Sequence, residues 1–94
     1  MTKPYYECHI TLEDEPSIAM PVVIACGWTF SCIDGDIILG EGMKCYATKH
    51  FNVRKHSEEE IKRILFETEL FMVGQALHPI RLKIEKVIFD NRRT

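Results

Sequence analysis

The chain has 94 residues, of which 46% are hydrophobic and 28% are charged, and its formal net charge is −2. This length suits a single domain over residues 1–94 with one hydrophobic core. The slightly acidic balance excludes the uniformly basic surface of a non-specific nucleic-acid binder. No segment reaches membrane-spanning length and the first residues contain no apolar signal region, so we predict a cytoplasmic protein without a membrane partner. In that compartment the four cysteines are expected to be free thiols: Cys8, Cys26, Cys32 and Cys45.

The first predicted elements are a strand and a short helix. Residues 4–13 alternate polar and apolar side chains, which is typical of a half-buried strand. Because strand residues two apart point to the same face, His9 and Thr11 share the more polar face of this strand. A short apolar segment over residues 17–26 predicts a helix, and Gly27 suits the left-handed position that ends one.

Two further strands are predicted over residues 28–33 and 43–51. A turn at Asp34-Gly35 and a glycine-containing loop separate them. The polar face of the later strand carries Tyr46, Thr48 and His50. This strand therefore presents a threonine and a histidine two residues apart, in the reverse order of the pair in residues 4–13.

The second half of the chain predicts a long helix followed by a last strand. Ser57 and Glu60 have the spacing of a capping box, and Gly74 suits the end of the helix. Apolar residues recur at helical spacing between them and predict a stripe that faces the core. The last strand covers residues 80–89. Its alternation places Ile80, Leu82 and Ile84 on the core face, and Arg81 and Lys83 on the polar face.

The element order is β-α-β-β-α-β, which predicts an α+β, ferredoxin-like sandwich with a four-stranded antiparallel or mixed sheet. Right-handed crossovers place both helices on one face of the sheet. In that topology the first and third strands are central neighbours. The helix-free face then brings together four residues that handle protons and hydrogen bonds: His9, Thr11, Thr48 and His50.

This polar face suggests a site for a phosphate-containing ligand such as a nucleotide, a cyclic phosphate or an RNA end. His9 and His50 are the candidate catalytic residues, because one neutral and one protonated imidazole can exchange protons with a phosphodiester. Hydroxyls and cations suit phosphate oxygens, so the candidate ligand-binding residues are Thr11, Thr48, Tyr46, Arg81 and Lys83. An ordinary solvated sheet face without a site is the alternative.

Metal binding is a second alternative for the same face. His9 and His50 with Glu7, Glu13 or Glu85 offer zinc-ligating atom types. The sequence contains no metal-binding helix motif and no close cysteine pair, so we assign neither a metal nor a cofactor.

Several segments together resemble a family of small uncharacterised bacterial and phage proteins: YYECHITLE, GWTFSCIDGD, GEGMKCYATKHF and RLKIEKVIFDNR. A looser resemblance is to one lobe of the two-histidine phosphoesterases, which carry His-x-Thr/Ser motifs on central strands. His9 and Thr11 match one such motif, whereas Thr48 and His50 stand in the reverse order. This resemblance implies phosphodiesterase chemistry, with the histidines moving protons and the hydroxyls holding the phosphate.

The predicted long helix supports a rival function. Phe66, Leu70 and Val73 form an apolar stripe beside the core stripe, and Phe71 extends it. A small two-layer sandwich cannot bury every side of such a helix. The rival is therefore a non-catalytic protein-interaction module, with a two-fold homodimer as the usual arrangement.

Overall fold

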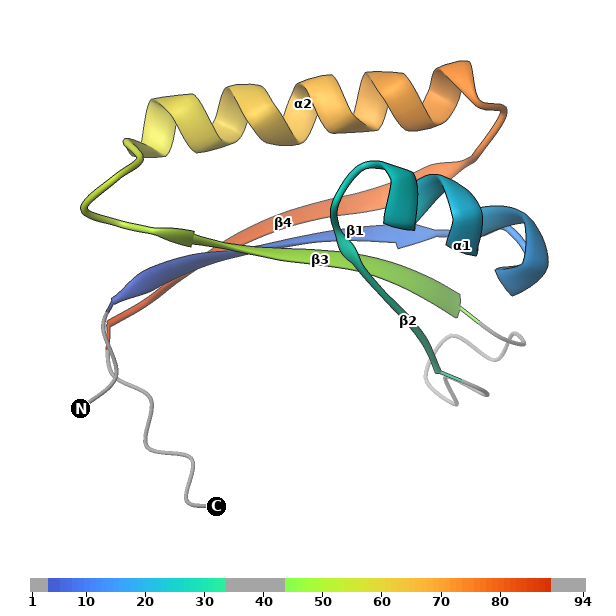
Figure 1. The fold of residues 1–94 in the computed structure, drawn as a ribbon, viewed down its shortest axis with the longest axis horizontal. Helices are drawn as coiled ribbons and strands as arrows, with labels where there is room; N and C mark the ends of the chain where they lie inside the picture. Colours follow the sequence, from blue (N-terminus) through green and yellow to red (C-terminus); the bar gives the residue numbers. More distant parts are fainter. Residues whose placement is uncertain (1–3, 34–43, 89–94) are drawn as a thin grey trace.

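The computed structural model describes residues 4–33 and 44–88, which form a four-stranded antiparallel sheet covered on one face by two helices (Figure 1). The strand order is β2-β3-β1-β4. This arrangement confirms the predicted ferredoxin-like β-α-β-β-α-β fold. The elements are β1 (Tyr5–Leu12), α1 (Pro16–Ala25), β2 (Thr29–Ile33), β3 (Lys44–Asn52), α2 (Glu58–Gly74) and β4 (Pro79–Val87). The predicted Asp34-Gly35 turn lies outside the described residues.

Both helices end in the same backbone arrangement. After α1, Gly27 adopts a left-handed φ of 78°, and Trp28 N–H donates to the Val23 carbonyl at 3.2 Å. After α2, Ala76 adopts the equivalent φ of 66°, and Leu77 N–H donates to the Met72 carbonyl at 3.0 Å. These are Schellman motifs, in which a left-handed residue lets the chain satisfy the last helical carbonyls. The predicted stop at Gly27 is confirmed, whereas α2 includes Gly74 and turns at an alanine.

The start of α2 follows the predicted cap only in part. The Ser57 hydroxyl accepts a hydrogen bond from Glu60 N–H at 3.1 Å. The Glu60 carboxylate instead contacts the His56 ring at 3.2 Å, and that ring packs edge-on against Phe51. This network connects the end of β3 to the first turn of α2.

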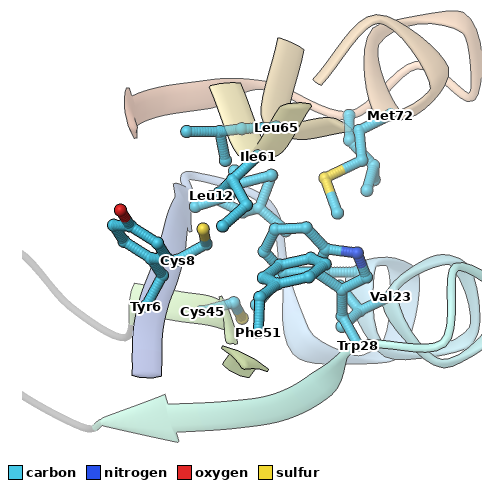
Figure 2. Close-up of a cluster of buried hydrophobic side chains, with 14 residues drawn as sticks. Tyr6, Cys8, Leu12, Val23, Trp28, Cys45, Phe51, Ile61, Leu65 and Met72 are labelled. Atoms are coloured by element: carbon cyan, nitrogen blue, oxygen red, sulfur yellow. The ribbon is translucent and has the colours of Figure 1, made fainter. Parts of the chain in front are cut away.

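The core lies between the sheet and the helices, and Figure 2 shows its larger side chains. Alternate residues of β1 point into it, and Ile10 and Leu12 are fully buried. From α2 the core receives Ile61, Leu65 and Met72. Successive strand residues point to opposite faces of the sheet. Because the apolar residues of β1 and β3 point into the core, their polar neighbours lie on the helix-free face.

The pairing of β4 with β1 contains an irregularity that changes which side chains of β4 face the core. The pairing of β1 with β4 shifts between Thr11 and Leu12. Ile80, predicted to share the core face with Leu82, is instead 48% exposed. Beyond the shift the register is regular, so Arg81 lies opposite Thr11.

Within residues 4–33 and 44–88, no helix has the length and apolar character needed to cross a membrane. Four apolar side chains on the outer side of α2 remain 47–69% exposed: Phe66, Leu70, Phe71 and Val73. On α1, Ile18, Met20 and Ile24 are 45–58% exposed. The outer side of the helical layer therefore exposes apolar side chains beside charged ones such as Arg63 and Glu67.

Candidate functional site

The helix-free face of the sheet contains a hollow of about 360 Å³. Its lining includes most of the residues selected from the sequence, together with Ser31 and Glu85: His9, Thr11, Tyr46, Thr48, Arg81 and Lys83. The register explains this grouping. His9 on β1 lies opposite Thr48 on β3 and opposite Lys83 on β4, while Thr11 lies opposite Tyr46 and Arg81. Two successive rows across the sheet therefore form the hollow.

His9 is held at both ring nitrogens. Its Nε2 lies 2.6 Å from Glu7 Oε1, and its Nδ1 lies 3.1 Å from Thr48 Oγ1. In the neutral ring, Nε2–H donates to the carboxylate and Nδ1 accepts the threonine hydroxyl proton. The result is a continuous chain of hydroxyl, imidazole and carboxylate across two adjacent strands. Such a chain fixes the imidazole, and with its proton donated to His9 the Thr48 oxygen can only accept from other groups.

His50 lies next to this chain but does not line the hollow with His9. It is opposite Glu7 on the neighbouring strand, and its Nε2 lies 3.0 Å from Glu7 Oε2. The ring stacks against Tyr5 at a centroid distance of 4.7 Å, and the side chain is 55% exposed. The predicted pair of histidines is thus connected through the two oxygens of one carboxylate, that of Glu7.

The β4 side of the hollow holds its cations. Lys83 Nζ lies 2.8 Å from Glu85 Oε1. The hydrogen bond and charge of Lys83 hold the pKa of the Glu85 carboxyl below its usual value, with smaller contributions from His9 and Arg81. Arg81 makes no salt bridge with any residue of the described segments. Among the described residues, its guanidinium is therefore the cation of this hollow without a carboxylate partner.

The sequence interpretation considered the two carboxylates of the face only as possible metal ligands and did not anticipate their pairing across the strands. Glu7 and Glu85 are directly opposite each other on β1 and β4. With His9 they place one potential metal-ligating atom each within 4.8 Å of one another. The signal was present in the alternation, because Glu7 shares the polar face with His9. The pairing of β1 with β4, which joins the two carboxylates, needs the three-dimensional register.

Chemically, the face divides into two parts. One part holds the imidazoles and carboxylates of His9, His50, Glu7 and Glu85, which can bind cations or exchange protons. The other part holds hydroxyls and the Arg81 guanidinium, which can donate several hydrogen bonds to one anion. His9 and Thr48 lie at the boundary and connect the two parts through their hydrogen bond.

Comparisons of this chain with protein-family models, with curated proteins and with solved structures found no match.

Proposed function

We propose that the hollow on the helix-free face binds a phosphate-containing ligand, such as a nucleotide, a cyclic phosphate or an RNA end. The observation that carries this proposal is the convergence of Arg81, Thr11 and Thr48 on one hollow of about 360 Å³. A guanidinium that makes no salt bridge within residues 4–33 and 44–88, together with neighbouring hydroxyls, suits the non-bridging oxygens of a phosphate. Thr48 donates to the phosphate once its hydroxyl proton leaves His9 Nδ1. Tyr46 and Ser31 line the same hollow and add further hydroxyls.

Ligand selection follows from the size and chemistry of the hollow. A phosphate group alone fills only part of such a volume, and the phenol ring of Tyr46 offers a surface on which a base or sugar can pack. Lys83 gains access to the ligand when it leaves Glu85, to which it now pairs at 2.8 Å. A nucleotide or RNA end therefore fits better than inorganic phosphate.

Hydrolysis of the bound ligand is the further step of this proposal, with His9 and His50 as the catalytic residues. Both ring nitrogens of His9 are engaged, so His9 acts on a ligand only if the ligand replaces Thr48 or Glu7 as its partner. His50 reaches the ligand through Glu7 or by rotating from its exposed position. The geometry therefore supports binding more strongly than turnover. We expect this function in the cytoplasm, a reducing compartment that would maintain the four cysteines as thiols.

The test is titration of 2′,3′-cyclic nucleotides and short RNAs into the purified protein, followed by NMR shifts. Arg81→Ala should weaken binding at least tenfold, because a charged hydrogen bond contributes about 1.5–3 kcal/mol. Arg63→Ala is the matched control, since Arg63 lies on α2 and pairs only loosely with Glu67 at 3.9 Å. Unchanged shifts at the hollow in the wild type would refute the proposal.

Turnover is measured separately with the same nucleotides and RNAs, using His9→Ala and His50→Ala. Loss of cleavage in both variants, with their circular dichroism unchanged, supports the two-histidine mechanism. Binding without cleavage by the wild type leaves a binding protein and removes the catalytic part of the proposal.

A second candidate function is a dimeric interaction module that uses the helical layer. The observation that favours it is the exposed apolar surface on the outer sides of both helices, where Leu70 is 69% and Ile24 is 58% exposed. Exposed apolar side chains of this size are typical of interaction sites where they form a patch. Sedimentation equilibrium of the wild type against Leu70→Glu tests it: a dimer that dissociates in the variant supports the module, and a wild-type monomer contradicts it.

A further inference from the structure

The acidic part of the helix-free face has the composition of a metal site. Glu7 and Glu85 lie directly opposite each other on β1 and β4, an arrangement in which two like charges repel. His9 lies two residues along from Glu7 on the same face. Each of the three contributes an oxygen or nitrogen atom, and these atoms lie within 4.8 Å of one another. A divalent cation between them offsets both carboxylate charges at once.

The distances require only side-chain adjustment. Ligand atoms around tetrahedral zinc are roughly 3.3 Å apart, given zinc–nitrogen and zinc–oxygen bonds of about 2.0–2.2 Å. His9 Nε2 and Glu7 Oε1 are now 2.6 Å apart and share a proton. Metal binding at Nε2 requires the other neutral tautomer, in which Nδ1–H donates to Thr48 Oγ1, and the Nε2 and Oε1 atoms separate slightly to accommodate the ion. The Glu85 side chain is 45% exposed and can rotate toward the ion.

Two of the three residues, Glu7 and His9, also have the supporting contacts that metal ligands need. A metal-ligating histidine usually donates its other ring N–H to an acceptor, which fixes its orientation. Here the other nitrogen of His9 lies 3.1 Å from Thr48 Oγ1. The second oxygen of Glu7 lies 3.0 Å from His50 Nε2. The support comes from two residues of β3, Thr48 and His50, so it is not a property of exposed carboxylates alone.

We propose that Glu7, His9 and Glu85 bind a divalent transition-metal ion, with Zn²⁺ as the best match. One imidazole and two carboxylates favour zinc over calcium, which takes only oxygen ligands. Three protein ligands leave a further coordination position open, as in catalytic rather than structural zinc sites. Because His9 and Glu85 also line the hollow, the ion borders the place where a ligand sits.

Lys83 is the competitor of the metal. Its ammonium group lies 2.8 Å from the Glu85 carboxylate and already neutralises the negative charge that would attract the ion. Metal binding therefore releases Lys83, whose flexible side chain is 47% exposed. This metal proposal does not depend on the proposed phosphate ligand, because metal binding can be measured without any phosphate compound present.

The experiment is calorimetric titration of Zn²⁺ into the full chain in a non-chelating buffer with a non-thiol reductant. We expect one ion per chain. Glu85→Gln should lower the affinity at least tenfold, and Glu67→Gln on α2 is the matched control that leaves it unchanged. Lys83→Met should raise the affinity at least threefold, which a purely structural role for these residues does not predict.

The four cysteine thiols could bind Zn²⁺ in place of the proposed site, and Co²⁺ spectra distinguish the two kinds of site. Cobalt bound by nitrogen and oxygen shows visible bands without the intense near-ultraviolet charge-transfer band of a thiolate ligand. A thiolate band, an absence of Zn²⁺ binding, or equal affinities of Glu85→Gln and the wild type would each overturn the proposal. The Glu85→Gln variant removes an exposed group, so its folding is checked by circular dichroism and expected to be unchanged.

Discussion

Thr48 and His9 face each other across the two central strands, and Thr48 Oγ1 lies 3.1 Å from His9 Nδ1. This contact orients the imidazole that both proposals use. We predict that Thr48→Val destabilises the fold by about 1 kcal/mol, the typical net value of one hydrogen bond. It should also weaken Zn²⁺ binding at least tenfold, since the histidine loses its supporting partner.

Thr48→Ser is the matched control for this prediction. It keeps the hydroxyl, so it should retain zinc affinity within about threefold of the wild type, well inside the tenfold loss expected when the supporting partner is removed. Denaturant unfolding and calorimetry measure the two effects. If the valine and serine variants behave alike, the hydroxyl does not position His9.

Gly27 and Ala76, the left-handed residues that follow α1 and α2, lead to predicted changes in stability of opposite sign. Ala76 adopts a φ of 66°, which is unfavourable for a residue with a Cβ atom, so Ala76→Gly should stabilise the protein by about 1 kcal/mol. Gly27→Ala should destabilise it by about 1–2 kcal/mol. The nearest atom to an added Cβ at Gly27 is Lys49 Nζ at 3.9 Å, so the loss would come from the backbone and not from a clash.

Thermal or denaturant unfolding of both variants checks these values. Gly74→Ala serves as a reference, because Gly74 is helical and an added Cβ meets no atom within 4 Å. It should stabilise through helix propensity alone, by about 1 kcal/mol. Destabilisation by Ala76→Gly would contradict the Schellman geometry after α2.

The fold could be predicted from the sequence because its local signals agree with one another. Alternation in residues 4–13, the left-handed glycine at Gly27 and the cap at Ser57 each specify one element or boundary. The exception was Ile80, whose exposure results from a register shift that involves the pairing of β1 with β4. Such a shift leaves no mark in the alternation of β4 itself.

The site could be predicted only as far as shared faces allow. Alternation places His9, Thr11, Thr48 and Arg81 on one face, and the topology makes their strands neighbours. It does not place His50 outside the hollow, nor does it make Glu7 the shared partner of both histidines. Those contacts depend on side-chain rotamers and on which residues are directly opposite, which periodicity does not determine.

Asp14 and His78 tie the end of β1 to the start of β4 and predict a pH effect. The Asp14 carboxylate accepts hydrogen bonds from His78 N–H at 2.6 Å and from the His78 ring at 2.8 Å. This hydrogen bond and the Asp14 charge raise the pKa of His78 above its usual value of 6.5. The stabilisation is therefore complete below pH 6.5 and is lost as the pH rises through the raised pKa.

NMR titration of the His78 ring measures this directly. We expect a pKa above 6.5 in the wild type and a return toward 6.5 in Asp14→Asn. Unfolding free energies between pH 6 and pH 8 should fall in the wild type more than in the variant. A His78 pKa that does not change in Asp14→Asn would show that the ring contact is not maintained in solution.

The thiols in the core should react slowly while the protein is folded. Burial, with a smaller contribution from the charge of Glu7, raises the pKa of Cys8 to about 11. Burial is also the main cause that raises the pKa of Cys45 to about 12, and the Cys32 thiol lies 3.7 Å from its sulfur. The thiolate is the reactive form, so a rise from 9.0 to about 11 lowers its population roughly 100-fold near pH 8.

Iodoacetamide labelling followed by mass spectrometry tests this prediction. In native protein at pH 8, Cys8 and Cys45 should be alkylated at least roughly 100-fold more slowly than in denatured protein, because burial also blocks access. Met72→Ala, which opens a cavity in the core, should accelerate labelling of both by increasing local or global unfolding. Rapid native labelling of Cys8 would mean that β1 is not packed under α2, and the helix-free face would then lack the rigid support on which both proposed sites depend.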